Sequence, residues 1–307
     1  MALAGCLCVV NCSRQASSGI VVNNAFKPLI RPETSVLAGI SLDKLKTTPL
    51  YQRHEKELDF PLLDASVQRL GFDPRRDVTD LLFASDGKTE VLMAQGHFQP
   101  KAIEAKLQAS GLQRRTYKGF TLLGDNRNTL AFLKGGILLA GSPEAVQADL
   151  DFGESGAGEV PEELQERLRT LPKNDQVWIV SRKGLPFAET PMRSDVQSAL
   201  SNILAFIRGT TAGLAVDNGL HLQANFNCVS NEGAQRVHDA IRGGIGFLRL
   251  STKDNETEML KLYDAIQVEQ DQNLVRVHAD LSGDTADKLL NLLPQVRARS
   301  DQFLRNQ

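Results

Sequence analysis

The hydrophobic and polar positions along this chain switch between two periods, one of two residues and one of three to four. Short apolar or alternating runs bounded by turn residues are typical of β-strands. The run Leu274–Leu281 shows this most plainly, because every second side chain is apolar. We predict strands at Glu33–Ile40, Val78–Ala84, Val91–Ala94, Gly119–Leu123, Thr129–Leu133, Ile137–Ala140, Val177–Ser181, Ala212–Val216, Leu220–Phe226 and Leu274–Leu281.

Helical spacing of apolar residues appears between these strands, and capping residues indicate where the helices begin. Ser142, followed by proline and glutamate, has the composition of a helix start. Asn231 and Asp284 are the expected caps of two later helices. We predict helices that begin at Ser41, near Leu62 and at Ser142, Asn231 and Asp284, and helices over Lys101–Ala109, Asp195–Leu204 and Met259–Ile266.

Two dipeptides predict tight hairpins between neighbouring strands. Asp86-Gly87 separates one pair of apolar runs, and Asn218-Gly219 separates another. Both tolerate the positive φ that two-residue hairpin turns need. Each hairpin is followed by a cap and an amphipathic helix, so Leu81–Leu107 matches Gly213–Ile241 in element order.

The order of strand, helix, hairpin, helix, strands and helix occurs twice, which predicts an α+β fold made of two similar halves. Each half is expected to be a mostly antiparallel sheet packed with helices, and we interpret the repeat as an internal duplication. The predicted boundaries are 1–31 for a start and tether, 32–152 for the first repeat, 153–172 for a linker with a short helix, and 173–307 for the second repeat.

The N-terminus carries the one motif that points to a location. Leu3-Ala4-Gly5-Cys6 resembles the lipobox of bacterial lipoproteins, in which the cysteine is acylated, and Cys6 is therefore the lipidation candidate. Members of that family have a basic and then an apolar segment before the box, whereas only five residues, none basic, precede Cys6. Either translation starts upstream, or the processed residue is Cys12, or the box is accidental and the protein is cytoplasmic. Ser13–Lys27 has the composition of a flexible tether.

A second resemblance concerns the body of the chain. Element order and the phrase Val36-Leu37-Ala38-Gly39-Ile40-Ser41-Leu42-Asp43-Lys44-Leu45 resemble uncharacterised bacterial envelope proteins with duplicated α+β domains. The resemblance implies a lipid-anchored, periplasmic or secreted protein and brings no known chemistry.

Composition and charge narrow the classes of partner. The formal net charge is -2, with 35 basic and 37 acidic residues interspersed, so nucleic acid is not the expected partner. No apolar run is long enough for a transmembrane helix, which leaves a lipid at the N-terminus as the expected membrane anchor. Cys228 is alone in the body of the chain and is expected to be a small buried residue.

No motif in the chain assigns a reaction, a metal or a cofactor. Gly87-Lys88-Thr89 lacks the upstream glycine of a phosphate-binding loop, and Ser142 lacks the neighbours of a hydrolase nucleophile. His97, His221 and His278 fall in strand-like runs without metal-ligand spacing. The basic doublets Arg75-Arg76 and Arg114-Arg115 are interpreted as solvated surface, with an anion or a lipid headgroup as the alternative partner.

Three functions remain after these exclusions. The first is a non-catalytic envelope protein that binds a partner protein or a hydrophobic ligand, in a groove between the halves. The second is a structural or assembly module that presents its sheets to other proteins. The third is a hydrolase whose catalytic residues come together only in the fold.

Overall fold

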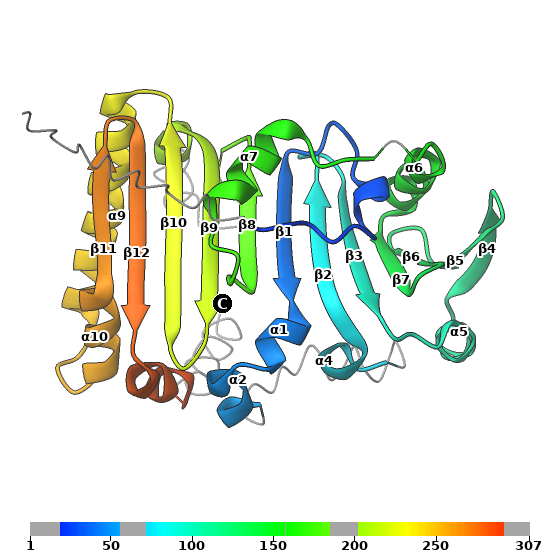
Figure 1. Cartoon of the computed structure of the whole chain (residues 1–307), viewed down its shortest axis with the longest axis horizontal. Coiled ribbons are helices and arrows are strands. Elements are labelled where there is room, and N and C mark those ends of the chain that lie inside the picture. Colours follow the sequence, from blue (N-terminus) through cyan, green and yellow to red (C-terminus); the bar gives the residue numbers. More distant parts are fainter. Residues whose placement is uncertain (1–18, 56–71, 157, 185–201, 292–307) are drawn as a thin grey trace, which may run out of the picture.

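The computed structural model describes residues 19–55, 72–156, 158–184 and 202–291. Its main feature is one continuous antiparallel sheet that runs along the molecule (Figure 1). In the described part of the chain the sheet has twelve strands in the order β11-β12-β10-β9-β8-β1-β2-β3-β7-β6-β5-β4. Helices pack against both of its faces, so the predicted α+β class is confirmed.

The predicted strands are present, several of them longer than expected. Those of the first half are β1 (Val36–Ser41), β2 (Val78–Ser85), β3 (Glu90–Gly96), β4 (Gln113–Tyr117), β5 (Phe120–Gly124), β6 (Thr129–Leu133) and β7 (Ile137–Gly141). Those of the second half are β8 (Val177–Ser181), β9 (Ile207–Val216), β10 (Leu220–Cys228), β11 (Ile266–Asp271) and β12 (Leu274–Leu281).

The helices connect these strands or flank them. They are η1 (Lys27–Leu29), α1 (Leu42–Lys46), α2 (Pro49–His54), α4 (Pro74–Asp77), α5 (Pro100–Ala109), α6 (Pro143–Glu154), α7 (Glu162–Thr170), α9 (Asn231–Ser251) and α10 (Thr257–Ala265). A further helix occupies 283–291 and is called the terminal helix below. No helix among these described residues is long and apolar enough to cross a membrane.

The two halves meet at the middle of the sheet, where β1 pairs with β8. Gly39 lies opposite Trp178, and Leu37 lies opposite Val180. Each half begins with three strands paired in sequence, β1-β2-β3 and β8-β9-β10. The origin of the two halves by duplication stays a prediction. The pairing of β1 with β8 joins the two predicted sheets into one.

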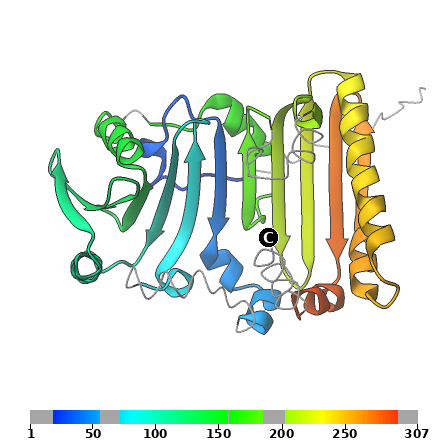
Figure 2. The same ribbon diagram turned by 180° about the vertical axis from the view of Figure 1, so that it is seen from behind.

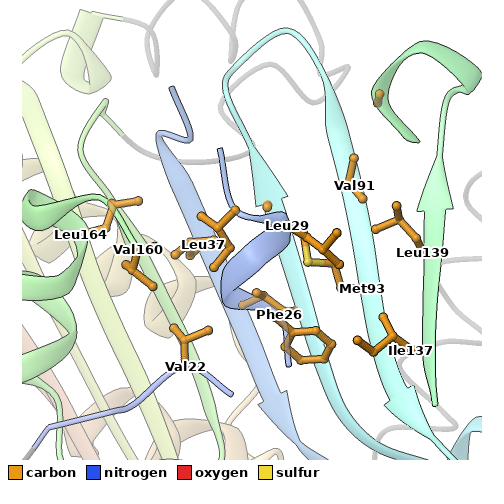
Figure 3. Packing of buried hydrophobic residues seen from close by; sticks show 14 of the residues in the cluster. Val22, Phe26, Leu29, Leu37, Val91, Met93, Ile137, Leu139, Val160 and Leu164 are labelled. Atoms are coloured by element: carbon orange, nitrogen blue, oxygen red, sulfur yellow. The ribbon is translucent and has the colours of Figure 1, made fainter. Parts of the chain in front are cut away.

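One face of the sheet, called the covered face, carries the largest core cluster. Leu37, Leu82, Met93 and Leu139 point to this side and are at most 1% exposed. The N-terminal segment 19–30, α6 and α7 pack over them, as Figure 3 shows for Val22, Phe26, Leu29 and Leu164. In each central strand every second side chain points to the covered face, and the buried apolar residues of this cluster occupy those positions.

The opposite face, called the groove face, has helices at its two ends. At the first-half end, Ile103 and Leu107 of α5 pack with Ala94 and Leu138. At the second-half end, α9 packs through Ala234 and Val237 and runs along the edge of the sheet beside β11 and β12 (Figure 2). The middle of this face, between these two clusters, is where the candidate site lies.

Two strands were missing from the prediction, and both are edge strands. β4 has the polar sequence Gln113-Arg114-Arg115-Thr116-Tyr117, which shows no apolar alternation because four of its five side chains are exposed. β11 directly follows α10, so the expected helix Met259–Ile266 was wrong at its end: Ile266 already pairs with Ala279 of β12. An edge strand has one neighbour and less to bury, which weakens its signal in the sequence.

The helix caps required three corrections. The residue that caps α9 is Ser230, whose side chain accepts a hydrogen bond from the Gly233 N–H, so the cap expected at Asn231 lies one residue earlier. The terminal helix begins at residue 283, before the cap expected at Asp284. Ser41 occupies the cap position of α1, but its side chain makes no capping hydrogen bond there. Serine and asparagine both suit caps, so sequence alone does not choose between neighbours.

The described part of the expected tether Ser13–Lys27 does not have the structure of a free tether, because Val22 and Phe26 are 3% and 1% exposed in the largest core cluster. Its composition of small polar residues did not show that these apolar side chains pack against the sheet.

Other predictions at this level concern the helix start at Ser142, the first hairpin and residues outside the structure. Ser142 caps α6 by accepting a hydrogen bond from the Ala145 N–H, as predicted, although α6 continues past Leu150 to Glu154. Gly87 has a φ of +91° in the hairpin between β2 and β3. The lipidation candidate Cys6, the helix expected near Leu62 and most of the one expected at Asp195–Leu204 lie outside the described residues.

Candidate functional site: an apolar groove across the sheet

Two adjoining cavities form a groove on the groove face of the sheet. Their volumes are about 500 and 430 Å³, and both belong to the middle of the sheet. They share four lining residues, one from each of β1, β2, β8 and β9: Ile40, Leu81, Val177 and Leu214. The groove therefore crosses the junction between the two halves.

The deeper end of the groove lies between the sheet and the helices that follow β1. Besides the shared residues, its walls come from α1, α2, α4, β9, β10 and the terminal helix. The apolar members are Leu42, Leu45, Leu50, Pro74, Val216, Leu220 and Leu290. The polar members are Tyr51 and Arg75.

The shallower end continues across the strands themselves. Its further walls are Ala38 on β1, Phe83 and Leu92 on the first-half side, and Ala212 and Leu222 on the second-half side. Leu92 and Leu222 are 42% and 41% exposed, high values for leucines in a central region of a sheet. From β3 to β10 the groove spans five strand spacings, about 24 Å.

The central strands are apolar on both faces, which explains why the groove has no polar floor. In β8, Trp178 and Val180 point to the covered face, while Val177 and Ile179 point into the groove. A strand buried on one face alone would have polar residues at the alternate positions. The second apolar set thus needs a partner of its own.

The polar end of the groove is a small cluster around Tyr51. Burial raises the pKa of Tyr51, and Glu55 raises it further, while the nearby Arg75 guanidinium acts to lower it. Arg75 forms a salt bridge with Asp73 at 3.0 Å between Nε and Oδ1. A ligand with an apolar chain and a polar head would find its polar contacts at this end.

A set of polar contacts joins α2 to the terminal helix and closes the deeper end. His54 Nε2 lies 2.6 Å from Asp287 Oδ1, and Arg53 Nη2 lies 3.1 Å from the same atom. Arg53 Nη1 also donates to the side-chain oxygen of Asn218 at 2.9 Å, in the turn between β9 and β10. We call this set the clasp, because it ties together α2 and the terminal helix, whose Leu50 and Leu290 both line the groove and belong to one hydrophobic cluster.

The histidines predicted as metal or proton-transfer candidates do not come together as a site. His221 Nδ1 lies 2.7 Å from Asp280 Oδ1, and His278 Nε2 lies 3.0 Å from the Gln267 side-chain oxygen. His97 follows β3 in the other half. Among the described residues no group of three or more histidines, cysteines or acids could hold a metal ion.

The other candidate residues take structural positions. Cys228 is 2% exposed in the cluster under α9, as predicted, and burial raises the pKa of its thiol. Arg114 pairs with Glu104, and Arg115 donates to Asn126. Of the basic doublets, Arg75 alone reaches the groove, and the Arg76 side chain is 80% exposed.

The groove residues were not singled out from the sequence, although a groove between halves was expected. They come from six or more segments and are ordinary apolar residues in each. A signal was present in the strands: runs such as Val177-Trp178-Ile179-Val180 are apolar at both alternate positions, which indicates burial on two faces.

Comparisons with known proteins support the fold alone. No family model matches the chain, and no curated protein matches it. Crystal form III of TP0453, a Treponema envelope lipoprotein, is similar with a TM-score of 0.50 and 8% identity over 87% of this chain and 96% of that chain. Forms I and IV of the same protein give TM-scores of 0.47 and 0.49 at 8% and 10% identity, over 90% and 87% of this chain and 98% and 95% of theirs.

Proposed function

We propose that this chain is a non-catalytic protein of the cell envelope that binds a hydrophobic ligand in the groove. The observation that carries the proposal is the apolar lining across β1 and β8, with polar groups at one end only. Ligand pockets of this kind have volumes of about 300 to 1,000 Å³ and are mostly apolar. The shared fold with an envelope lipoprotein supports the proposed location.

The dimensions favour a long aliphatic chain as the apolar part of the ligand. The groove extends about 24 Å across five strand spacings. The hydrocarbon core of a bilayer is about 30 Å thick, so one acyl chain reaches about 15 Å. A single acyl chain is therefore shorter than the span of the shallower cavity, and the adjoining deeper cavity offers Tyr51 and Arg75 to its polar head.

Binding is tested with a fluorescent fatty acid analogue and with lipid extracted from the protein purified from its own cells. Leu214→Glu places a charge where the two cavities meet, because Leu214 lines both. We expect this variant to lose at least tenfold in affinity, about 1.4 kcal/mol. The matched control is Leu250→Glu on α9, where the native side chain is 88% exposed.

Ala212→Trp is a second variant that keeps the groove uncharged and fills its shallower end. It is expected to weaken binding of long chains more than of short ones. Circular dichroism confirms that each variant is folded. Equal binding by Leu214→Glu, Leu250→Glu and the native protein would show that the groove is not the site.

The envelope location has its own experiment. We expect the mature protein to fractionate with membranes, to begin at Cys6 and to be heavier by a lipid modification, whereas Cys6→Ser should release it from the membrane fraction. Cys228→Ser is the control, because Cys228 is buried in the fold. A soluble form with unmodified thiols would show that the lipobox-like sequence is accidental.

A further inference from the structure

A further cavity, besides the two that form the groove, lies on the covered face, beneath the N-terminal segment and on the other side of the sheet from the groove. Its volume is about 240 Å³, which is the space of roughly eight water molecules. Val22, Asn23 and Phe26 line it from the N-terminal segment, and Figure 3 shows Val22 and Phe26 above the strands of the junction. We call it the polar pocket because charged side chains line it.

Four charged side chains converge on the polar pocket. Asp80 of β2 and Asp175, just before β8, are the acids, and Lys44 of α1 and Lys173 are the bases. Among the described residues, no ion pair joins any of these four to another charged group. Lys44 and Lys173 also line another, open cavity of about 560 Å³ next to the pocket, which is distinct from the groove, and this places both lysines at the mouth of the pocket.

The two carboxylates belong to opposite walls. Asp80 is on β2, opposite Ser41 of β1. The Asp175 carboxylate lies directly over Gly213 of β9, where a Cβ atom would collide with it. Because β2 and β9 are three strand spacings apart, about 14 Å, the pocket separates the two acids.

Asp175 retains capacity to accept hydrogen bonds from a ligand. The residue is 3% exposed, and its Oδ2 accepts a hydrogen bond from Gln223 at 3.1 Å. A carboxylate offers about four acceptor positions, so one amide donor leaves most of them unused. Burial raises the pKa of Asp175, which indicates that the folded chain supplies no cation to stabilise its charge.

Aromatic rings complete the pocket between the acids. Trp178 lies over Gly39, whose missing side chain makes room for the indole, and Phe26 lines the pocket from the N-terminal segment. Aromatic faces attract ammonium groups, most strongly where water is excluded. The acids and the rings lie inside the pocket, and the lysines lie at its mouth. The charge of the lining therefore changes from negative inside the pocket to positive at its mouth.

We infer that the polar pocket binds a small zwitterion, with its ammonium group beside Asp175 and Trp178 and its anionic group at Lys44 and Lys173. Such a ligand gives the buried Asp175 a cation and the two lysines an anion, and none of the three has an ionic partner among the described residues. Its chemistry is that of a free amino acid or of the phosphoethanolamine head of a lipid. The pocket is separate from the groove, so the inference does not depend on the proposed function.

Calorimetry on the full chain tests the inference with probes of matched size. Phosphoethanolamine and γ-aminobutyrate carry both charges, whereas ethanolamine and inorganic phosphate carry one each. We expect at least one zwitterion to bind at millimolar concentration or better, and each singly charged probe to bind at least tenfold more weakly. Preference for phosphoethanolamine indicates a lipid head, and preference for the amino acid indicates a free metabolite.

Substitutions assign the binding to this pocket. Lys173→Ala removes an exposed charge at the mouth, and Asp175→Asn keeps the shape of the buried side chain, so both should weaken zwitterion binding at least tenfold. Lys253→Ala and Asp254→Asn, both at exposed positions after α9, are the charge-matched controls and should leave it unchanged. Leu214→Glu, on the groove face, should also leave it unchanged.

Three results would overturn the inference. They are the absence of zwitterion binding at millimolar concentration, binding of ethanolamine or phosphate as tight as that of the zwitterions, and native affinity in Lys173→Ala. Since Lys173 is exposed, that variant is expected to fold, and a melting curve verifies it.

Discussion

At the scale of single residues, the positions under most constraint are those where the covered face leaves no spare volume. Gly39 is one, because the Trp178 indole occupies the space above it, and Gly213 is another, because the Asp175 carboxylate lies there. Neither glycine has a positive φ, so close packing and not backbone conformation requires them. Both contribute to the polar pocket by letting a larger neighbour lie against the sheet.

Gly39→Ala is expected to destabilise the protein by about 1 to 3 kcal/mol, since Trp178 must move or the strands must shift. The control is Gly243→Ala in α9, where a new Cβ meets nothing within 4 Å. Alanine should stabilise that helix by up to about 1 kcal/mol. Urea unfolding measures both changes, and equal stability of the two variants would contradict the packing argument.

Asp149 of α6 is a buried carboxyl whose ionisation should lower stability. Its Oδ1 lies 2.7 Å from Arg31 Nε, yet burial outweighs that pair and raises the pKa from 3.8 to about 7. At pH values between these two pKa values, the folded chain binds more protons than the unfolded chain. The contribution of Asp149 to stability is therefore full below pH 4 and is lost as the pH rises through 7, by up to about 1.4 kcal/mol per pH unit.

The measurement is the free energy of unfolding from pH 4 to 8 for the native chain and for Asp149→Asn. We expect the difference between them to change across this window in the stated direction. Asp86, which also contacts Arg31, has its pKa lowered to about 2 and changes stability below this window, so it does not obscure the result. A constant difference would show that Asp149 is ionised throughout.

At the scale of elements, the clasp determines how firmly the deeper end of the groove is closed. It connects α2 and the terminal helix, which are 233 residues apart in the chain, through His54 and Asp287. Hydrogen bonds to charged groups contribute about 1.5 to 3 kcal/mol each when well formed. Arg53 has a side chain 38% exposed, so we expect its ion pair to contribute less, no more than about 1 kcal/mol.

Asp287→Ala should loosen this end and not the rest of the sheet. Hydrogen exchange at the amides of α2 should become faster, and a bound fatty acid analogue should dissociate several-fold faster. Asp284→Ala on the same helix is the control, because Asp284 is exposed. Unchanged exchange at α2 in Asp287→Ala would contradict a role for the clasp.

At the scale of the whole molecule, the pairing of β1 with β8 decides that the two halves share one sheet. The pairing buries apolar residues of both halves on the covered face, since Leu37 and Val180 contribute to one core cluster. The groove and the polar pocket both lie at this junction. Each would be incomplete in either half alone.

Because β1 and β8 join the two halves in one continuous sheet, we expect this junction to unfold together with the rest of the sheet. Trp178 is the single tryptophan and lies in β8, so its fluorescence reports the junction, whereas far-ultraviolet circular dichroism reports the whole chain. The two signals should give one coincident transition in urea. Two separated transitions would show that the halves unfold independently.

Local patterns were sufficient for most of the elements and insufficient for the edges. The hairpin of β2 and β3 was predicted because Asp86-Gly87 and the flanking apolar runs lie within a few residues. The edge strand β4 was not, because exposed polar side chains carry no period. Of the candidate site residues named from sequence, Arg75 lines the groove, and Cys6 lies outside the described residues.

The sequence by itself determined the α+β class, the central strands and most of the helices, because burial of one side of a helix or strand leaves a period within ten to twenty residues. Tertiary structure alone decided the pairing of β1 with β8, the groove and the polar pocket. Ile40, Val177 and Leu290 lie far apart in the chain and meet at the groove only after the strands have paired. Such proximity depends on long-range packing, which no local period records.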